Sequence, residues 1–270
     1  MIDKLSLTIY RQPNFQYLEL NGEITEAYSK RQMYKYICEL DHIVVLYEPH
    51  RFSDARNDMI PFTKIDLNPK YFECFDHMLA CLFVIFKYDE NDLIPAEDFN
   101  ITRLDIAVDL EDFNIKHILS SLHVKNIRDE SMNLIKGTIY AGSDPKVVIY
   151  NKNSEILNRI KKRWDVTPYE LKMLESGKEH TRFEVRKRHT GLKLAHLPAA
   201  AEALAVYFDR LEFFDLKVDC ACTVMQFLYK QINRKFRADL EKFKNMQIVP
   251  ALKEKYIASV REWFTSKEPF

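Results

Sequence analysis

Three short runs of the sequence, 101–110, 146–152 and 181–188, alternate apolar residues with charged or polar ones. Because successive side chains of a β-strand point to opposite faces, each run predicts a strand with one apolar and one polar face. If the three strands share a sheet, its open face brings carboxylates, basic groups and a tyrosine together. The residues predicted on that face are Arg103, Asp105, Asp109, Tyr150, Lys152, Arg182, Glu184, Arg186 and Arg188.

The carboxylates of this set have the chemistry of a cation site. Hard divalent ions such as Mg²⁺ and Mn²⁺ prefer carboxylate oxygens, so Asp105, Asp109 and Glu184 are candidate metal ligands. Two aspartates four residues apart on one strand are separated by roughly 13 Å, so a bulge or a neighbouring strand must help to bring ligands to one ion. An amphipathic sheet whose outer face carries pairs of acidic and basic residues explains the same pattern.

The three runs, read in order, resemble signature blocks of a known family. The blocks are ITRLDIAVD, TIYAGSDPKVVIYNKNSE and TRFEVRKR, and they fall between residues 101 and 188. They are similar to blocks of the rolling-circle replication initiators: the trans-acting Rep nickases of plasmids, with related integrative-element relaxases and filamentous-phage initiators. The residues that carry the resemblance are Arg103, Asp105, Ala107, Asp109, Thr138, Tyr140, Gly142, Ser143, Tyr150, Asn151, Lys152, Glu155, Arg182 and Glu184.

This resemblance implies a site-specific enzyme that nicks and rejoins one strand of DNA. In the family, a tyrosine attacks the strand and stays linked to the 5′ phosphate, and the matching position here is Tyr150. A free phenol has a pKa of about 10 and needs activation. Lys152, two residues further on, is predicted to favour the phenolate or to hold a phosphate oxygen. Tyr140, in the opposite arm of a predicted hairpin, is the reserve nucleophile.

The resemblance also implies roles for the remaining groups and names the partners. Mg²⁺ or Mn²⁺ held by Asp105, Asp109 and Glu184 would polarise the scissile phosphate, with Glu155 as a weaker fourth ligand. The implied substrate is DNA, as a single strand or a cruciform origin, and the family pattern includes a host helicase recruited to the nick and homodimers. The arginines expected to contact DNA phosphates are Arg103, Arg182, Arg186 and Arg188.

Two other functions fit the same residues. A non-catalytic DNA-binding initiator or repressor would keep the sheet without turnover. A metal nuclease would use the same carboxylates without a covalent step. Only the nicking-joining enzyme forms a covalent adduct between the protein and DNA.

Charge and composition favour a polyanion partner and a cytoplasmic protein. Residues 1–145 carry 15 Lys and Arg against 24 Asp and Glu, whereas residues 146–270 carry 25 against 16, which gives net charges of −9 and +9. Solvated basic helix faces would give the same split. Five cysteines without zinc spacing predict free thiols in a reducing compartment. The absence of an apolar leader and a longest apolar stretch of only 78–86 predict no signal peptide and no membrane span.

The strands and helices expected to position these groups indicate an α+β fold. In this fold an antiparallel sheet with a polar catalytic face is backed by helices and followed by a mostly helical C-terminal region. Residues 1–190 are the predicted catalytic domain, and 191–270 the helical region, packed on the sheet or contacting DNA. A further strand is expected at 134–141, joined to 146–152 by a turn at 142–145. Helices are expected at 68–88, 113–122, 153–163, within 164–177, and at 192–214, 219–232, 234–245 and 250–265.

Overall fold

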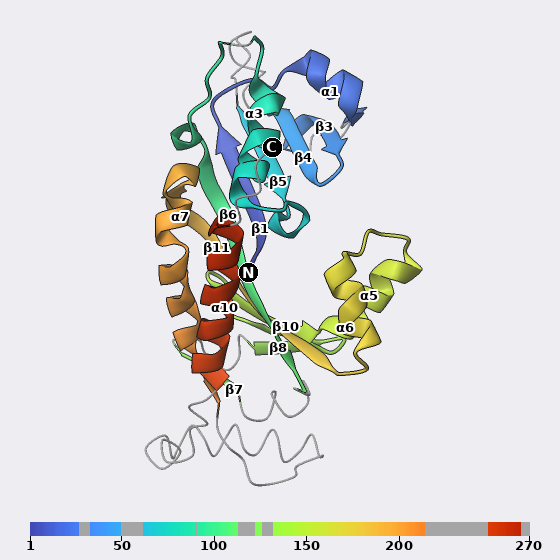
Figure 1. Ribbon diagram of the computed structural model, residues 1–270, viewed down its shortest axis with the longest axis vertical. Helices are drawn as coiled ribbons and strands as arrows, with labels where there is room; N and C mark the ends of the chain where they lie inside the picture. Colours follow the sequence, from blue (N-terminus) through green and yellow to red (C-terminus); the bar gives the residue numbers. More distant parts are fainter. Residues whose placement is uncertain are drawn as a thin grey trace. The chain divides into compact units, whose positions relative to one another are not determined.

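The structure is a computed structural model, and it describes residues 1–26, 33–49, 62–89, 91–112, 122–125, 132–213 and 248–265 (Figure 1). Within these residues the chain has the predicted α+β fold, with a large antiparallel sheet and helices placed between and after its strands. No helix in these ranges is long and apolar enough to cross a membrane.

Ten strands form the large sheet. They are β1 (Ile2–Ile9), β2 (Glu23–Glu26), β3 (Tyr34–Leu40), β4 (Ile43–Pro49), β5 (Thr63–Leu67), β6 (Asn100–Glu111), β8 (Met132–Ile135), β9 (Thr138–Ala141), β10 (Lys146–Asn151) and β11 (His180–Lys193). Their order in the sheet is β2-β3-β4-β5-β1-β6-β11-β10-β9-β8. A second sheet pairs β7 (Leu122–Val124) with β12 (Leu211–Phe213).

Two compact units divide the chain, and each is built from several segments. Unit 1 comprises Met1–Ile106, Lys187–Glu202 and Ser259–Phe270, and unit 2 comprises Ala107–Arg186 and Ala203–Ala258. This division differs from the predicted boundary between residues 190 and 191, because β6 and β11 each contribute residues to both units.

Unit 1 combines five short strands and the first half of β6 with helices. Leu5, Leu7 and Ile9 of β1 are buried, as their alternation with polar residues predicts. The backbone N–H of Asn14 donates to the carbonyl of Ile85 at 2.7 Å, which ties two of the helices together. The helices that lie entirely in this unit are α1 (Phe15–Asn21), η1 (Pro69–Tyr71), α3 (Phe75–Phe86), η2 (Ala96–Asp98), η4 (Leu194–His196) and α7 (Leu197–Ala200).

In unit 2 the strands have one apolar and one polar face. Ile149 of β10 lies opposite Phe183 of β11 and Ile139 of β9, and all three side chains are fully buried. One residue further along β10, on the other face, Tyr150 lies opposite Arg182. The alternation in the sequence therefore assigned these residues to the correct faces.

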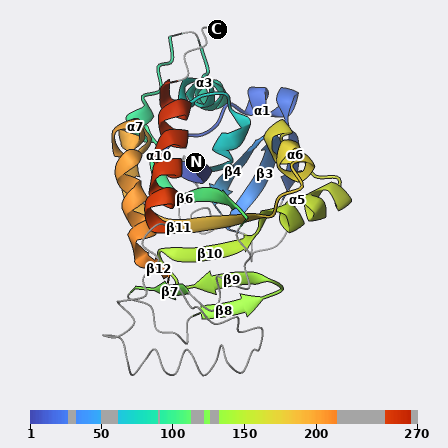
Figure 2. The same ribbon diagram turned by 60° about the horizontal axis from the view of Figure 1, so that its bottom comes forward.

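Helices flank the strands of unit 2. They are α5 (Lys152–Lys161) and α6 (Pro168–Glu175), together with η5 (Glu202–Arg210) and α10 (Ile248–Thr265), which extend into unit 1. Figures 1 and 2 show α5 and α6 on one side of these strands and η5 with α10 on the other. Tyr256 of α10 is fully buried and packs edge-on against Phe208 of η5, with ring centroids 5.8 Å apart.

The predicted strands at 101–110, 146–152 and 181–188 are confirmed as β6, β10 and β11. The predicted strand at 134–141 is instead the hairpin β8–β9. Its turn residues Lys136 and Gly137 have φ angles of 49° and 79°. Two successive positive φ angles are typical of the two-residue turn that reverses a chain between antiparallel strands.

Most of the predicted helices that fall on described residues are present. Residues 68–88 form η1 and α3, residues 153–163 correspond to α5, and α6 is the short helix expected in the polar connector. The predicted helix at 192–214 is broken into η4, α7 and η5 and ends in β12. The helices predicted at 113–122, 219–232 and 234–245 lie outside the described residues, apart from Leu122, which begins β7.

Helix α6 begins with a reciprocal cap that supports the region around the polar face. The Oγ1 of Thr167 accepts a hydrogen bond from the Glu170 N–H at 3.2 Å, and the Glu170 carboxylate accepts one from the Thr167 N–H at 3.0 Å.

We expect Thr167→Ala to lower the free energy of unfolding by about 1 kcal/mol, while Thr167→Ser keeps the acceptor and most of the stability. Urea unfolding followed by circular dichroism measures both variants, and equal stabilities would contradict the role of the cap.

Candidate functional site

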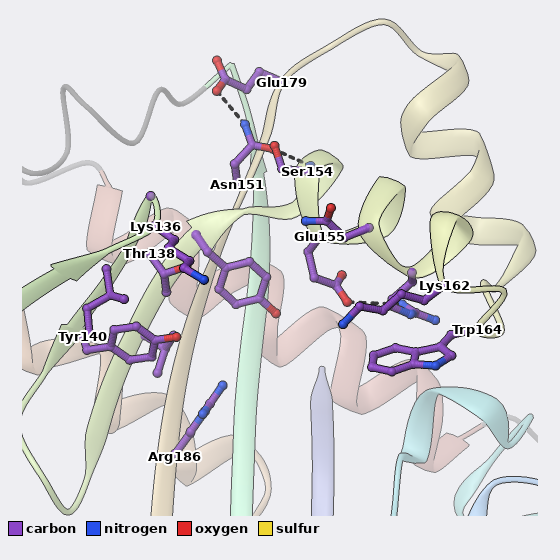
Figure 3. Close-up of a pocket in the computed structure, with 16 residues that line it drawn as sticks. Lys136, Thr138, Tyr140, Asn151, Ser154, Glu155, Lys162, Trp164, Glu179 and Arg186 are labelled. Carbon is purple, nitrogen blue, oxygen red and sulfur yellow. Dashed lines mark hydrogen bonds and ion pairs between the residues drawn. The ribbon is translucent and has the colours of Figure 1, made fainter.

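A pocket of about 910 Å³ lies within unit 2 (Figure 3). Its walls come from the turn between β8 and β9, from β9, β10 and β11, and from helix α5 with the residues that follow it. The charged residues among its lining are the basic Lys136, Arg159, Lys162 and Arg186 and the acidic Glu155 and Glu179. This excess of basic groups favours an anionic ligand.

Both candidate nucleophiles line this pocket. Tyr140 pairs with Val148 in the β9–β10 register, two residues before Tyr150, so the two tyrosines share one face of the sheet. Figure 3 shows Tyr140 and Arg186 reaching into the pocket from the sheet. The Nζ of Lys146 lies 4.7 Å from the centroid of the Tyr140 ring, a cation–π contact that holds this ring in place.

Tyr150 lies where strand β10 gives way to helix α5. The next residue, Asn151, is the N-cap of the helix, and its Oδ1 accepts from the Ser154 N–H at 2.8 Å. Its Nδ2 donates to Glu179 at 2.8 Å (Figure 3). The backbone that carries the tyrosine is therefore fixed on its C-terminal side by a helix cap and by a link to the residue before β11.

The prediction that Lys152 shares the strand face of Tyr150 is wrong. Lys152 is the first residue of α5, only 1% exposed, and its Nζ lies 2.6 Å from Glu155 and 3.0 Å from Glu170. The cap at Asn151 ends the strand, so the alternation of faces no longer applies one residue later. Lys152 therefore holds α5 to α6 rather than pointing along the sheet.

A buried network of charges connects these two helices. Glu170, 2% exposed, accepts from Arg159 at 2.7 Å as well as pairing with Lys152. Arg159 also donates to the backbone carbonyl of Asp165. Because a buried charge without a partner is strongly destabilising, the members of this network depend on one another.

Each of the three predicted metal ligands is bound to an arginine. In unit 2, Arg182 donates twice to Asp109, at 2.7 Å to each oxygen, and both side chains are 2% exposed. In the same unit, Arg186 donates to Glu184 at 2.6 Å. Burial raises the pKa of the Tyr169 phenol of α6, the charge of Asp109 raises it further, and the charge of Arg182 lowers it.

The third ligand belongs to unit 1. There Asp105, also 2% exposed, accepts from Arg103 at 2.9 and 2.5 Å. The face predicted to be open is thus buried at Asp105, Ala107 and Asp109. Alternation in the sequence shows which residues share a face, but not whether that face is covered.

These ion pairs bear on the predicted cation site. Both oxygens of Asp109 already accept from Arg182, so a divalent ion would have to displace the guanidinium. Among the described residues, no group of three His, Cys, Asp or Glu side chains is arranged to hold a metal ion. In this structure the three carboxylates are therefore partners of arginines.

The four predicted DNA-binding arginines have different surroundings. Arg182 is fully buried on Asp109, so the prediction that it contacts a DNA phosphate does not hold in this arrangement. Arg103 and Arg186 are half-buried, and only Arg186 lines the pocket. Arg188 is exposed, in the part of β11 that belongs to unit 1.

Several pocket residues were not singled out from the sequence. Among them are Lys136, Lys162 and Trp164, which come from the β8–β9 turn and the end of α5. A signal was available, since the segment reads KKRW at 161–164, and a run of basic residues beside an aromatic one is typical of single-stranded nucleic-acid contacts.

No protein-family model, no curated protein and no solved structure matches this chain. The resemblance to rolling-circle replication initiators therefore rests on the sequence blocks between residues 101 and 188.

The structural role of Lys152 can be measured. Lys152→Ala leaves Glu170 buried without one of its cations, so we expect it to lower the free energy of unfolding by about 3–5 kcal/mol. The matched control is Lys162→Ala, because this lysine lies at the other end of the same helix but is exposed, and its change should stay within about 0.5 kcal/mol. A Lys152→Ala protein as stable as the wild type would contradict the structural role and return Lys152 to the catalytic one.

Proposed function

We propose that the protein is a site-specific DNA nicking and joining enzyme in which Tyr150 forms a covalent 5′-phosphotyrosine intermediate. The observation that carries the proposal is the place of Tyr150 on the wall of a basic pocket, on the same sheet face as Arg186. The sequence blocks that resemble the replication initiators supply the reaction class. The proposed substrate is a single-stranded or cruciform origin; a host helicase and a second copy of the chain stay predicted partners.

The proposed reaction is a transesterification. The Tyr150 Oη forms a bond to phosphorus as the bond from phosphorus to the 3′ oxygen breaks. The phenol proton leaves to solvent, and the departing 3′ oxygen takes up a proton to become a 3′ hydroxyl. Rejoining is the reverse step, because the phosphotyrosine ester keeps the energy of the broken phosphodiester bond.

The pocket offers groups for the charge that develops on the phosphate. Arg186 and Lys162 line it together with Tyr150. Fixed cations beside a phosphoryl group stabilise its transition state when they are already oriented before the reaction. Arg186 is held in this way by its hydrogen bond to Glu184 at 2.6 Å.

Removing the nucleophilic hydroxyl is the direct test. Tyr150→Phe deletes one oxygen and keeps the ring, so we expect the fold and DNA affinity to stay near wild type while the covalent adduct disappears. The measurement is the SDS-stable complex formed with a labelled pool of random-sequence single-stranded oligonucleotides and Mn²⁺. Tyr140→Phe is the matched control, because Tyr140 lines the same pocket on the same face, and it should retain the adduct.

The site of attachment separates the two tyrosines. Mass spectrometry of the digested adduct should place a nucleotide on the peptide that contains Tyr150. A nucleotide on Tyr140 would keep the mechanism and overturn the assignment. Full adduct formation by the Tyr140/Tyr150 double Phe variant would reject the proposed reaction.

The requirement for Mg²⁺ or Mn²⁺ stays a prediction, and chelation tests it without disturbing the buried ion pairs. We expect EDTA to abolish the adduct and added Mn²⁺ to restore it, with the circular dichroism spectrum unchanged throughout. Substituting Asp109 by Ala would be a poorer test, because it leaves Arg182 buried without the carboxylate it binds. An undiminished adduct in EDTA would assign charge stabilisation to the basic side chains of the pocket.

A second candidate is a DNA-binding initiator or repressor without catalytic activity. The observation that favours it is the pairing of Asp105, Asp109 and Glu184 with arginines. Under this function the protein binds the same oligonucleotide pool, and no adduct forms with either metal.

A further inference from the structure

Trp164 is a large exposed aromatic residue that the nicking step does not use. It is 60% exposed and lines the pocket that holds Tyr150. Figure 3 shows its ring across the pocket from Tyr140, next to Lys162. An aromatic ring of this size left open in a pocket is typical of a binding surface.

The backbone fixes where this ring lies. Beyond α5, the Trp164 N–H donates to the carbonyl of Arg159 and the Arg163 N–H to that of Ile160, both at 3.0 Å. These are the two hydrogen bonds of a Schellman motif. In this motif the first residue past the helix end adopts a left-handed conformation. Arg163 takes that conformation, with φ 58°. Since Arg159 is anchored on Glu170, the ring is presented from a hydrogen-bonded helix end.

One cation lies against the ring, and others line the pocket. The Nζ of Lys162 lies 4.4 Å from the centroid of the Trp164 ring, and Lys136 and Arg186 line the same pocket. Proteins that bind single-stranded nucleic acid combine these two kinds of group, because a base stacks on the ring while cations contact the backbone phosphates. An uncharged apolar ligand would use the ring but not the cation beside it.

We propose that this pocket is a single-stranded DNA subsite in which one base stacks on Trp164 and an adjoining phosphate is bound by Lys162. The inference rests on the proposed function for its substrate, and it adds the residues that hold an unstacked nucleotide near Tyr150. Because every base has a π-face, the subsite accepts all four bases, and the choice of sequence must come from other contacts.

The chain allows Trp164 to be observed alone. It has two tryptophans, and Trp263→Phe leaves Trp164 as the only one. Trp263 packs on Phe75 with centroids 5.6 Å apart, and its buried indole N–H has no hydrogen-bond partner among the described residues, so phenylalanine removes no hydrogen bond there. We expect oligothymidylate to quench the fluorescence of Trp164. An abasic oligonucleotide of equal length should bind through its phosphates without quenching.

Affinity gives the second readout. Trp164→Ala should weaken oligothymidylate binding roughly 5- to 150-fold and leave the affinity for the abasic oligonucleotide unchanged, while Trp164→Phe restores most of the loss. The matched control is Tyr88→Ala in unit 1. Tyr88 is 54% exposed and has the Arg11 guanidinium 5.9 Å from its ring centroid, so it is the same kind of pair outside the pocket; its substitution should not change either affinity.

The outcomes separate this inference from the proposed function. Equal losses for the two oligonucleotides, or unchanged oligothymidylate binding by Trp164→Ala, would overturn the subsite. Base-dependent binding by a wild-type protein that forms no adduct would keep the subsite and reject nicking. Adduct formation with binding independent of Trp164 would reject the subsite alone.

Discussion

Charges buried in unit 2 must each find a partner, and this constraint determines how Tyr150 is held. An unpaired charge removed from water costs several kcal/mol. Lys152 and Glu170, both buried, satisfy the requirement through each other, and Asp109 does so through Arg182. Lys152 is the second residue after Tyr150 in the sequence. Arg182 lies opposite the tyrosine in the register of β10 and β11. The tyrosine is therefore flanked, along the chain and across to β11, by charged residues whose partners the fold already specifies.

The same constraint separates the charges that build the fold from those that can meet a ligand. Lys152 and Arg182 are committed to buried carboxylates, whereas Lys162 is exposed and Arg186 is half-buried on the pocket wall. Contacts with a polyanion are consequently expected at the rim of the pocket more than along the centre of the sheet. The basic excess of residues 146–270 includes both kinds of residue, so a count of charges does not reveal which of them a ligand can reach.

Strand alternation was sufficient to identify β6, β10 and β11 and to assign Tyr150 and Arg182 to one face, because side-chain direction in a strand is a local property. It did not predict that Asp109 is buried, since burial depends on residues distant in sequence. The change of direction at Lys152 had a local signal: Asn151 precedes a helical pattern, and asparagine is a common N-cap. The turn at Gly137 also had a local signal, which was the glycine itself. This glycine was assigned to the predicted strand at 134–141.

The residue found at position 163 in related chains would show why Arg163 is there. Its left-handed conformation costs an arginine about 1 kcal/mol relative to glycine. Selection for the turn alone would therefore let glycine or asparagine replace it during divergence. Retention of arginine in descendants of the same ancestor would mean that its side chain is itself under selection. Position 163 thus distinguishes, within a lineage, a residue kept for the shape of a helix end from one kept for its charge.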